Sequence, residues 1–197
     1  KKKHPEHKDL LQALDKMEQS IKDSMKIFDF ARVYEKIGVE ELVDVDVGKT
    51  ISEAAEIFPS VSFKIINECN GLTVKADSLL RQLIYNFFDN TQKYGQKATY
   101  AKISFMKTSE GIKLIYEDDG LGIPSKGKEQ LFKQGFSTGG STGLGLFLSK
   151  KMLEAYGWSI TEEGKPGEGA KFVITIPTLP HDMMLQERIL ACKEGSR

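Results

Sequence analysis

Cysteine is scarce in this sequence. Only two cysteines occur among 197 residues, Cys69 and Cys192, and they lie far apart without a CxxC pair. This spacing argues against a disulfide framework and against a zinc site. It suits a reducing compartment, and we expect a cytoplasmic location.

Net charge and long apolar runs are missing as well. The 28 basic residues balance the 28 acidic ones, so the overall charge points to no nucleic-acid or anionic-membrane partner. No apolar run reaches the roughly 18 residues that a membrane span needs, because Arg81 interrupts even the stretch 79–88. The basic start is not a secretory signal. We expect a soluble chain whose parent protein reaches a membrane only through parts outside this sequence.

The hydrophobic content of 40% is enough for one packed domain with an appendage. In the appendage, apolar residues alternate in steps of four and three, with Ser24 as the one weak position. These positions are Leu10, Leu14, Met17, Ile21, Ser24, Phe28 and Ala31. The spacing predicts a long helix that either lies on its own domain or forms a seam with other helices.

From residue 42 onward, strand and helix patterns mix. Strands are expected near 43–47, 61–65, 72–75, 103–105, 112–116, 158–161 and 170–176, helices at 50–58, 77–94 and 143–156, and a loop at 123–142. Asp77 or Ser78 would cap the second helix, and Ser141 or Thr142 the third. We predict an α+β fold, a two-layer sandwich of one mixed, mostly antiparallel sheet with helices on one face, preceded by the long N-terminal helix.

Three polar residues share one face of the expected helix 77–94. Asn86, Asn90 and Lys93 are spaced by four and three residues, so they project in similar directions. An amide oxygen is a competent Mg²⁺ ligand, and a lysine offers a point charge for phosphate. Taken alone, the spacing also fits a plain solvated helix face.

An acidic glycine turn, Asp118-Asp119-Gly120-Leu121-Gly122, follows an apolar strand. A buried carboxylate can accept a hydrogen bond from the exocyclic amine of adenine, and glycines let the backbone approach a flat ligand. The same turn could be an ordinary loop.

A second glycine motif, Gly143-Leu144-Gly145, opens the expected helix 143–156. Exposed N–H groups at such a start bind phosphate. The chain has no GxxxxGK[ST], and a loop rather than a strand precedes these glycines, which disfavours a P-loop and a dinucleotide fingerprint. The segment 123–142, anchored by Phe132 and Phe136, can close over a nucleotide as a lid.

In this order, the four motifs resemble the N, G1, F and G2 boxes of sensor histidine kinases. These belong to the wider group of Bergerat-fold ATPases that includes gyrase, mismatch-repair proteins and a heat-shock chaperone. The resemblance covers roughly residues 42–177 and implies ATP and Mg²⁺ as cofactors. It implies Asn90 as the Mg²⁺ ligand, Asn86 and Lys93 beside the phosphates, Asp118 at adenine, Tyr94 stacked near the base or ribose, and Gly120, Gly122, Phe132, Thr142, Gly143, Leu144 and Gly145 around the nucleotide.

Asn86 helps to choose within this group. Hydrolysing members carry a glutamate at this position to activate water, and an amide cannot serve as that base. Phosphoryl transfer, with Asn86 and Lys93 as the catalytic residues, is therefore favoured over an ATP-hydrolysing switch of the gyrase or chaperone type. The motif residues also disfavour a non-catalytic adaptor of the same fold.

The resemblance divides the chain into three parts. Residues 1–41 resemble the second helix of a dimerisation and histidine-phosphotransfer region with its linker, residues 42–180 the ATP-binding catalytic domain, and residues 181–197 form a tail. Neither His4 nor His7 is followed by the acidic residue usual in the family, so the acceptor histidine is expected upstream. The implied partners are that phosphotransfer region, a second copy of the full-length protein and the aspartate of a response regulator.

Overall fold

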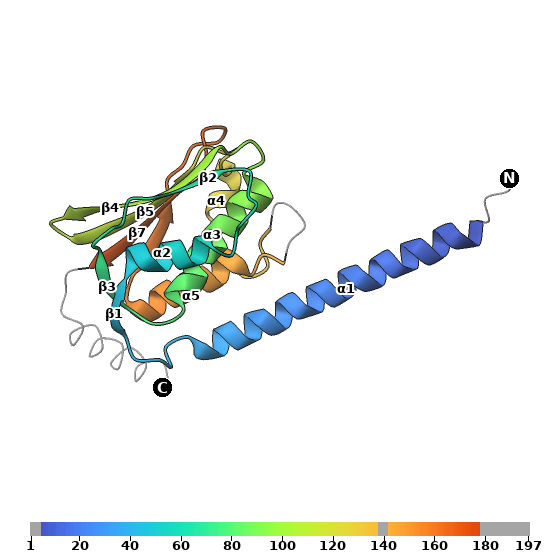
Figure 1. Ribbon diagram of the computed structural model, residues 1–197, viewed down its shortest axis with the longest axis horizontal. Coiled ribbons are helices and arrows are strands. Elements are labelled where there is room, and N and C mark those ends of the chain that lie inside the picture. Colours follow the sequence, from blue (N-terminus) through green and yellow to red (C-terminus); the bar gives the residue numbers. More distant parts are fainter. Residues whose placement is uncertain (1–4, 138–141, 178–197) are drawn as a thin grey trace.

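A long helix precedes the folded domain. The computed structural model of the chain describes residues 5–137 and 142–177, and its first element, α1 (Pro5–Lys36), projects from the rest of the molecule (Figure 1). Ser141, His4 and the tail 181–197 lie outside these ranges. No helix in the described ranges is long and apolar enough to cross a bilayer.

Most of the seam on α1 is uncovered. Leu10 is 56% exposed and Phe28 is 74% exposed. Near the end of the helix, Phe30 and Val33 pack against the core, and the Phe30 ring lies 6.2 Å from that of Phe147. Of the two arrangements expected from the spacing, α1 does not lie along its own domain.

The main sheet has five strands in the order β2-β4-β5-β7-β6. These are β2 (Lys64–Asn67), β4 (Tyr100–Thr108), β5 (Gly111–Asp118), β6 (Ser159–Glu162) and β7 (Lys171–Pro177). Only β2 and β4 run parallel, while the other neighbours pair antiparallel. Along β5, Leu114, Tyr116 and Asp118 are buried and alternate with half-buried residues, because successive side chains of a strand point to opposite faces.

Three helices cover one face of this sheet (Figure 1). They are α2 (Val47–Ala55), α3 (Leu80–Tyr94) and α5 (Gly145–Tyr156). The α3 side chains Leu83, Ile84, Phe87 and Phe88 are almost fully buried between the layers. The mixed, mostly antiparallel sheet with helices on one face is as predicted.

The structure departs from the predicted elements in three places. The strands β1 (Val43–Asp46) and β3 (Thr73–Ala76) form a separate two-stranded ribbon. A short helix, α4 (Ser125–Lys128), lies within the segment predicted to be only loop. Neither α3 nor α5 has a side-chain cap, so the predicted caps Asp77, Ser78 and Thr142 were wrong.

Two of these side chains also bind partners from other parts of the domain. Asp77 Oδ1 accepts hydrogen bonds from the Leu79 amide at 2.8 Å and from the Tyr156 hydroxyl. The Ser78 hydroxyl donates to Glu40 Oε1 at 2.9 Å. Both residues therefore join the start of α3 to other parts of the domain.

Candidate functional site

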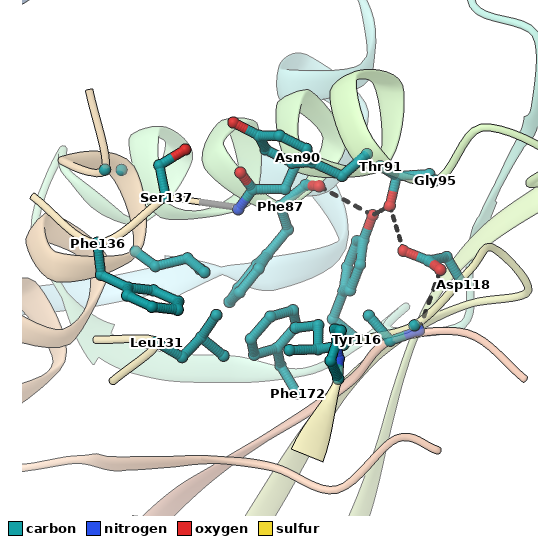
Figure 2. A pocket seen from close by; sticks show the side chains of 18 residues that line it. Phe87, Asn90, Thr91, Gly95, Tyr116, Asp118, Leu131, Phe136, Ser137 and Phe172 are labelled. Carbon is teal, nitrogen blue, oxygen red and sulfur yellow. Dashed lines mark hydrogen bonds between the residues drawn. The ribbon is translucent and has the colours of Figure 1, made fainter. Parts of the chain in front are cut away.

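A pocket lies where α3, the end of β5 and the start of α5 meet (Figure 2). Its lining includes six of the residues predicted from the motifs: Asn90, Tyr94, Asp118, Gly122, Gly143 and Gly145. Six others, Asn86, Lys93, Gly120, Phe132, Thr142 and Leu144, do not line it. Segments far apart in the sequence thus supply one cavity with an apolar floor and polar groups at its edges.

Asp118 stands at one end of the pocket, at the last position of β5. Its side chain is only 7% exposed. Oδ1 accepts hydrogen bonds from the backbone amides of Gly120 at 2.9 Å and Ala170 at 3.1 Å. Oδ2 accepts a hydrogen bond from the Thr91 hydroxyl. Three donors therefore fix a buried carboxylate that faces the cavity.

Thr91 and Tyr116 also line the pocket but belong to none of the predicted site residues. Their hydroxyl oxygens lie 2.7 Å apart, and the Tyr116 hydroxyl donates to the Phe87 carbonyl at 3.0 Å (Figure 2). The sequence did offer a signal for both residues. Thr91 follows Asn90 directly, and Tyr116 shares the inward face of its strand with Asp118, two residues later. The partnership between them could not be predicted without the packing of α3 on β5.

The glycines of the acidic turn serve contacts within the chain. A Cβ on Gly120 would lie 2.7 Å from the backbone of Gly95. Gly122 has a φ of +66°, and a Cβ there would lie 2.5 Å from the Lys165 carbonyl oxygen. The end of α3 and the β6–β7 turn are thus a further reason for glycine at these positions. Gly122 also lines the pocket, and the approach of a flat ligand to these glycines stays a prediction.

Asp119 points away from Asp118 and ties the acidic turn to the start of β4. Its Oδ1 accepts hydrogen bonds from the amides of Thr99 at 2.7 Å and Tyr100 at 3.0 Å, and its Oδ2 accepts one from the Thr99 hydroxyl at 2.5 Å. Desolvation alone would raise the pKa of this carboxyl, but the bonds from Thr99 and Tyr100 outweigh it and lower the pKa.

We expect Asp119→Asn to remove an acid-sensitive part of the stability. A depressed carboxyl pKa contributes stability that is present above the unfolded value of about 4 and is lost as the pH falls through the folded value. Thermal unfolding from pH 3 to pH 7 measures this. The melting temperatures of the two proteins should differ most near neutral pH and converge in acid. Parallel curves would contradict the assignment.

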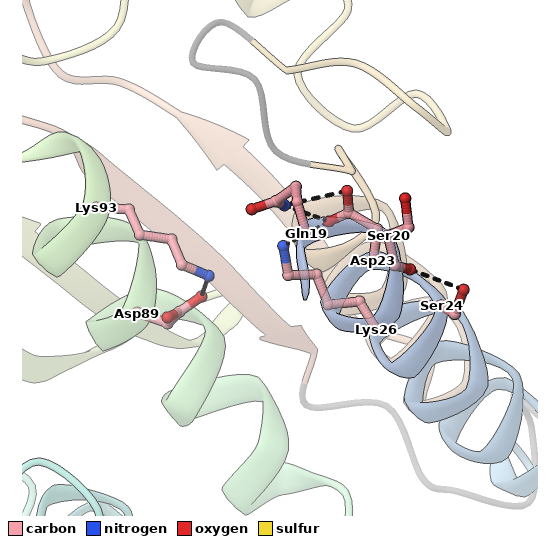
Figure 3. Close-up of polar contacts among 7 residues, drawn as sticks. All are labelled: Gln19, Ser20, Asp23, Ser24, Lys26, Asp89 and Lys93. Carbon is pink, nitrogen blue, oxygen red and sulfur yellow. Dashed lines mark hydrogen bonds and ion pairs between the residues drawn. The ribbon is translucent and has the colours of Figure 1, made fainter. Parts of the chain in front are cut away.

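The three polar residues of α3 do not act together in the structure. Asn90 lines the pocket. Asn86 is 8% exposed, and its Nδ2 donates to Ser149 Oγ at 3.1 Å and to the Gly145 carbonyl at 3.3 Å. Lys93 instead pairs with Asp89 on the exposed side of the helix (Figure 3). Asn86 thus joins α3 to the first turn of α5, which carries the second glycine motif.

The lid segment contributes Ile123, Pro124, Leu131 and Phe136 to the lining. Phe132 lies outside the lining, edge-on to Phe172 with ring centroids 6.3 Å apart. Its ring also lies 5.9 Å from the Lys150 ammonium group of α5. Phe132 therefore anchors the lid to the sheet and α5.

An ion pair holds the root of the lid. Lys128 Nζ lies 2.6 Å from Glu162 Oε2, and the Glu162 side chain is only 2% exposed. Glu162 Oε1 also accepts the amide of Gly164 at 3.0 Å. The start of the lid is thereby tied to β6 and to the β6–β7 turn that packs under the acidic turn.

The start of α5 presents backbone to the cavity. Gly143, with a φ of +63°, and Gly145 both line the pocket, and a Cβ on Gly145 would meet nothing within 4 Å. The helix begins at Gly145 without a side-chain cap. Its first N–H groups have no partner within the helix, which is the usual arrangement of a phosphate site.

Among the described lining residues, the Asn90 amide is the group that could take part in holding a magnesium ion. In the described ranges, no group of three or more His, Cys, Asp or Glu side chains could hold a metal ion. Asn90 remains, and its Nδ2 is buried without a hydrogen-bond partner. Mg²⁺ is commonly bound through one or two protein oxygens, with water and substrate phosphates completing its shell. The Asn90 amide oxygen suits that task.

Comparison with known proteins gives consistent matches. Residues 75–180 match the family described as histidine kinase-, DNA gyrase B- and HSP90-like ATPase. The sensor histidine kinase AruS of Pseudomonas aeruginosa is 28% identical over 167 residues, which cover 75% of this chain and 17% of that protein. The chain therefore spans about a sixth of this curated relative.

Solved structures agree on the fold. The catalytic domain of histidine kinase ThkA superposes with a TM-score of 0.61 at 24% identity, covering 72% of this chain and all of that one. Full-length ShkA in complex with AMPPNP gives a TM-score of 0.66 at 21% identity, covering 90% of this chain and 41% of that one. These likenesses confirm the predicted fold class.

Proposed function

Because the chain belongs to the histidine kinase-, DNA gyrase B- and HSP90-like ATPase family, we propose that its ATP-binding catalytic domain transfers the γ-phosphoryl group of Mg·ATP to a histidine. That histidine would lie on a helix upstream of this sequence and would pass the group to an aspartate of a response regulator. One observation carries the proposal: Asp118, Asn90, Gly143 and Gly145 converge on one pocket.

Each part of the pocket has a task in this proposal. Asp118 accepts a hydrogen bond from the adenine amine, and Tyr94 flanks the base or ribose. The N–H groups at the start of α5 bind phosphate oxygens, and the lid excludes water. Asn90 would hold Mg²⁺, which neutralises phosphate charge when bound. Lys93 would reach the phosphates after release from Asp89.

The residues that line the pocket favour phosphoryl transfer over the hydrolysis of ATP. Among the described residues that line the pocket, Asp118 is the sole carboxylate, and no histidine or glutamate is present. Asp118 is engaged by three donors at the base end. Asn86 is an amide that joins α3 to α5. A base that could activate water is therefore missing from this part of the site.

The uncovered seam of α1 supports a role in dimerisation. Leu14, Met17 and Ile21 are all more than half exposed on one helix, and an exposed apolar stripe with this spacing fits packing against another helix. We place α1 as the second helix of a histidine-phosphotransfer hairpin in a homodimeric parent protein. The domain would work in the cytoplasm, where ATP is available.

Phosphorylation of a longer stretch of the parent protein, which includes the helix before Lys1, tests the proposal. With Mg²⁺ and radiolabelled ATP, we expect a label that is stable in base and lost in acid, as phosphohistidine is. Asn90→Ala should slow labelling at least roughly tenfold. Gln92→Ala, an exposed change outside the lining, is the matched control. Steady phosphate release without labelled protein would identify a hydrolase instead.

A further inference from the structure

We infer that Thr91 and Tyr116 are positioning residues that aim Asp118 at the 6-amino group of a purine. In this way they set a preference for 6-amino over 6-oxo purine nucleotides. The inference rests on the proposed function, because it requires the nucleotide base to lie beside Asp118. Neither residue belongs to the four motifs, and neither has a role in the phosphate end of the site.

The three side chains form a buried chain of hydrogen bonds (Figure 2). The Thr91 hydroxyl donates to Asp118 Oδ2, and its oxygen lies 2.7 Å from the Tyr116 hydroxyl. Thr91 is 3% exposed and Tyr116 is 2% exposed. Bulk water therefore cannot substitute for either hydroxyl.

The occupied lone pairs of Asp118 show which atom meets the ligand. A carboxylate offers about four acceptor sites. Two on Oδ1 are taken by the amides of Gly120 and Ala170, and one on Oδ2 is taken by Thr91. One acceptor site on Oδ2 is left, on a residue that lines the pocket. A single donor from the ligand fits there.

Tyr116 holds its hydroxyl oxygen 2.7 Å from that of Thr91. Burial raises the pKa of the Tyr116 phenol, so the phenol stays neutral and keeps its proton. Its ring is stacked on Phe87 with centroids 4.9 Å apart, which holds the hydroxyl in place. The Tyr116 proton goes to the Phe87 carbonyl, and the only proton of Thr91 goes to Asp118 Oδ2.

This direction makes Asp118 an acceptor. A 6-amino group donates a hydrogen bond and is matched, whereas a 6-oxo group presents a second acceptor to the carboxylate and is repelled. The bond from Thr91 to Asp118 Oδ2 therefore favours the 6-amino purine.

The test compares ATP with inosine triphosphate, which carries a 6-oxo group in place of the amine. Thr91→Val keeps the shape of the side chain and removes its hydroxyl. We expect it to weaken ATP binding by roughly threefold to tenfold and to change inosine triphosphate binding less than about twofold. Tyr116→Phe should have a smaller effect in the same direction. Thr91→Ser should restore the wild-type preference.

The control and the contrary outcomes are distinct. Thr50→Val removes another buried threonine hydroxyl, one that bonds to the Asp46 carbonyl outside the pocket, and should alter neither affinity. Equal losses for both nucleotides in Thr91→Val and Tyr116→Phe would show a merely structural role and overturn the inference. So would unchanged ATP binding in both variants. If the wild-type domain bound no ATP, the proposed function itself would fail.

Discussion

Asp118→Asn should weaken ATP binding by roughly 10- to 150-fold, which corresponds to the loss of one charge-assisted hydrogen bond of about 1.5–3 kcal/mol. The amides of Gly120 and Ala170 would retain the remaining oxygen of the asparagine. Its Nδ2 would then take the place of Oδ2 and face the Thr91 hydroxyl. A donor would stand where the adenine amine needs an acceptor.

Isothermal titration calorimetry with Mg·ATP measures this loss. Glu117→Gln is a matched control, because it removes the same charge one residue earlier on β5. Glu117 pairs with Lys102 at 2.6 Å on the partly exposed side of the sheet. We expect the control to bind ATP like the wild type. Unchanged affinity in Asp118→Asn would remove the adenine assignment, and a lost cooperative unfolding transition would make Asp118 primarily structural.

Gly169→Ala should destabilise the domain by about 3–5 kcal/mol and abolish ATP binding with it. Gly169 has a φ of +113°, and a Cβ there would lie 1.8 Å from the carbonyl oxygen of Asp118. The backbone would have to move. That movement would break the bond from the Asp118 amide to the Ala170 carbonyl at 3.0 Å and the bond from the Ala170 amide to Asp118 Oδ1.

Gly167→Ala is a control that carries the strain of a positive φ without the steric clash expected in Gly169→Ala. Gly167 lies in the same turn with a φ of +86°, but a Cβ there would meet nothing within 4 Å. Its alanine variant should lose only the conformational cost of about 1–2 kcal/mol and should still bind ATP. Urea denaturation of both variants measures the difference. Similar losses for the two would contradict a specific role for the contact with Asp118.

Local sequence patterns predicted the helices and strands well, but they predicted the caps at the starts of the helices less well. The alternation along 112–116 and the apolar face of α3 correctly indicated a strand and a helix, since these periods follow from backbone geometry alone. The caps failed for another reason. Asp77 and Ser78 are good cap residues, but α3 begins after both of them, and their side chains also bind Tyr156 and Glu40 across the fold. These contacts join segments that are distant in the chain, so neighbouring residues in the sequence do not indicate them.

The motif residues were found because their chemistry is local, but their partners were not. Six of the predicted residues line the pocket, among them Asn90 and Asp118. Asn86 was expected beside the phosphates. In the structure it is bound to Ser149, 63 residues further along the chain, and its place beside the phosphates stays a prediction. The remaining predicted roles, including Mg²⁺ at Asn90 and phosphate at Lys93, stay predictions.

The amino-acid sequence by itself determined the fold class, the family resemblance and the main polar groups of the pocket. Periodicity, glycine turns and short motifs are properties of residues close in the chain. They can therefore be recognised without the tertiary structure. Only the tertiary structure decided that Thr91 and Tyr116 hold Asp118, that Asn86 joins two helices, and that the glycines face backbone. Each of these depends on side chains and backbone brought together from distant segments, where distance and burial select one partner among many.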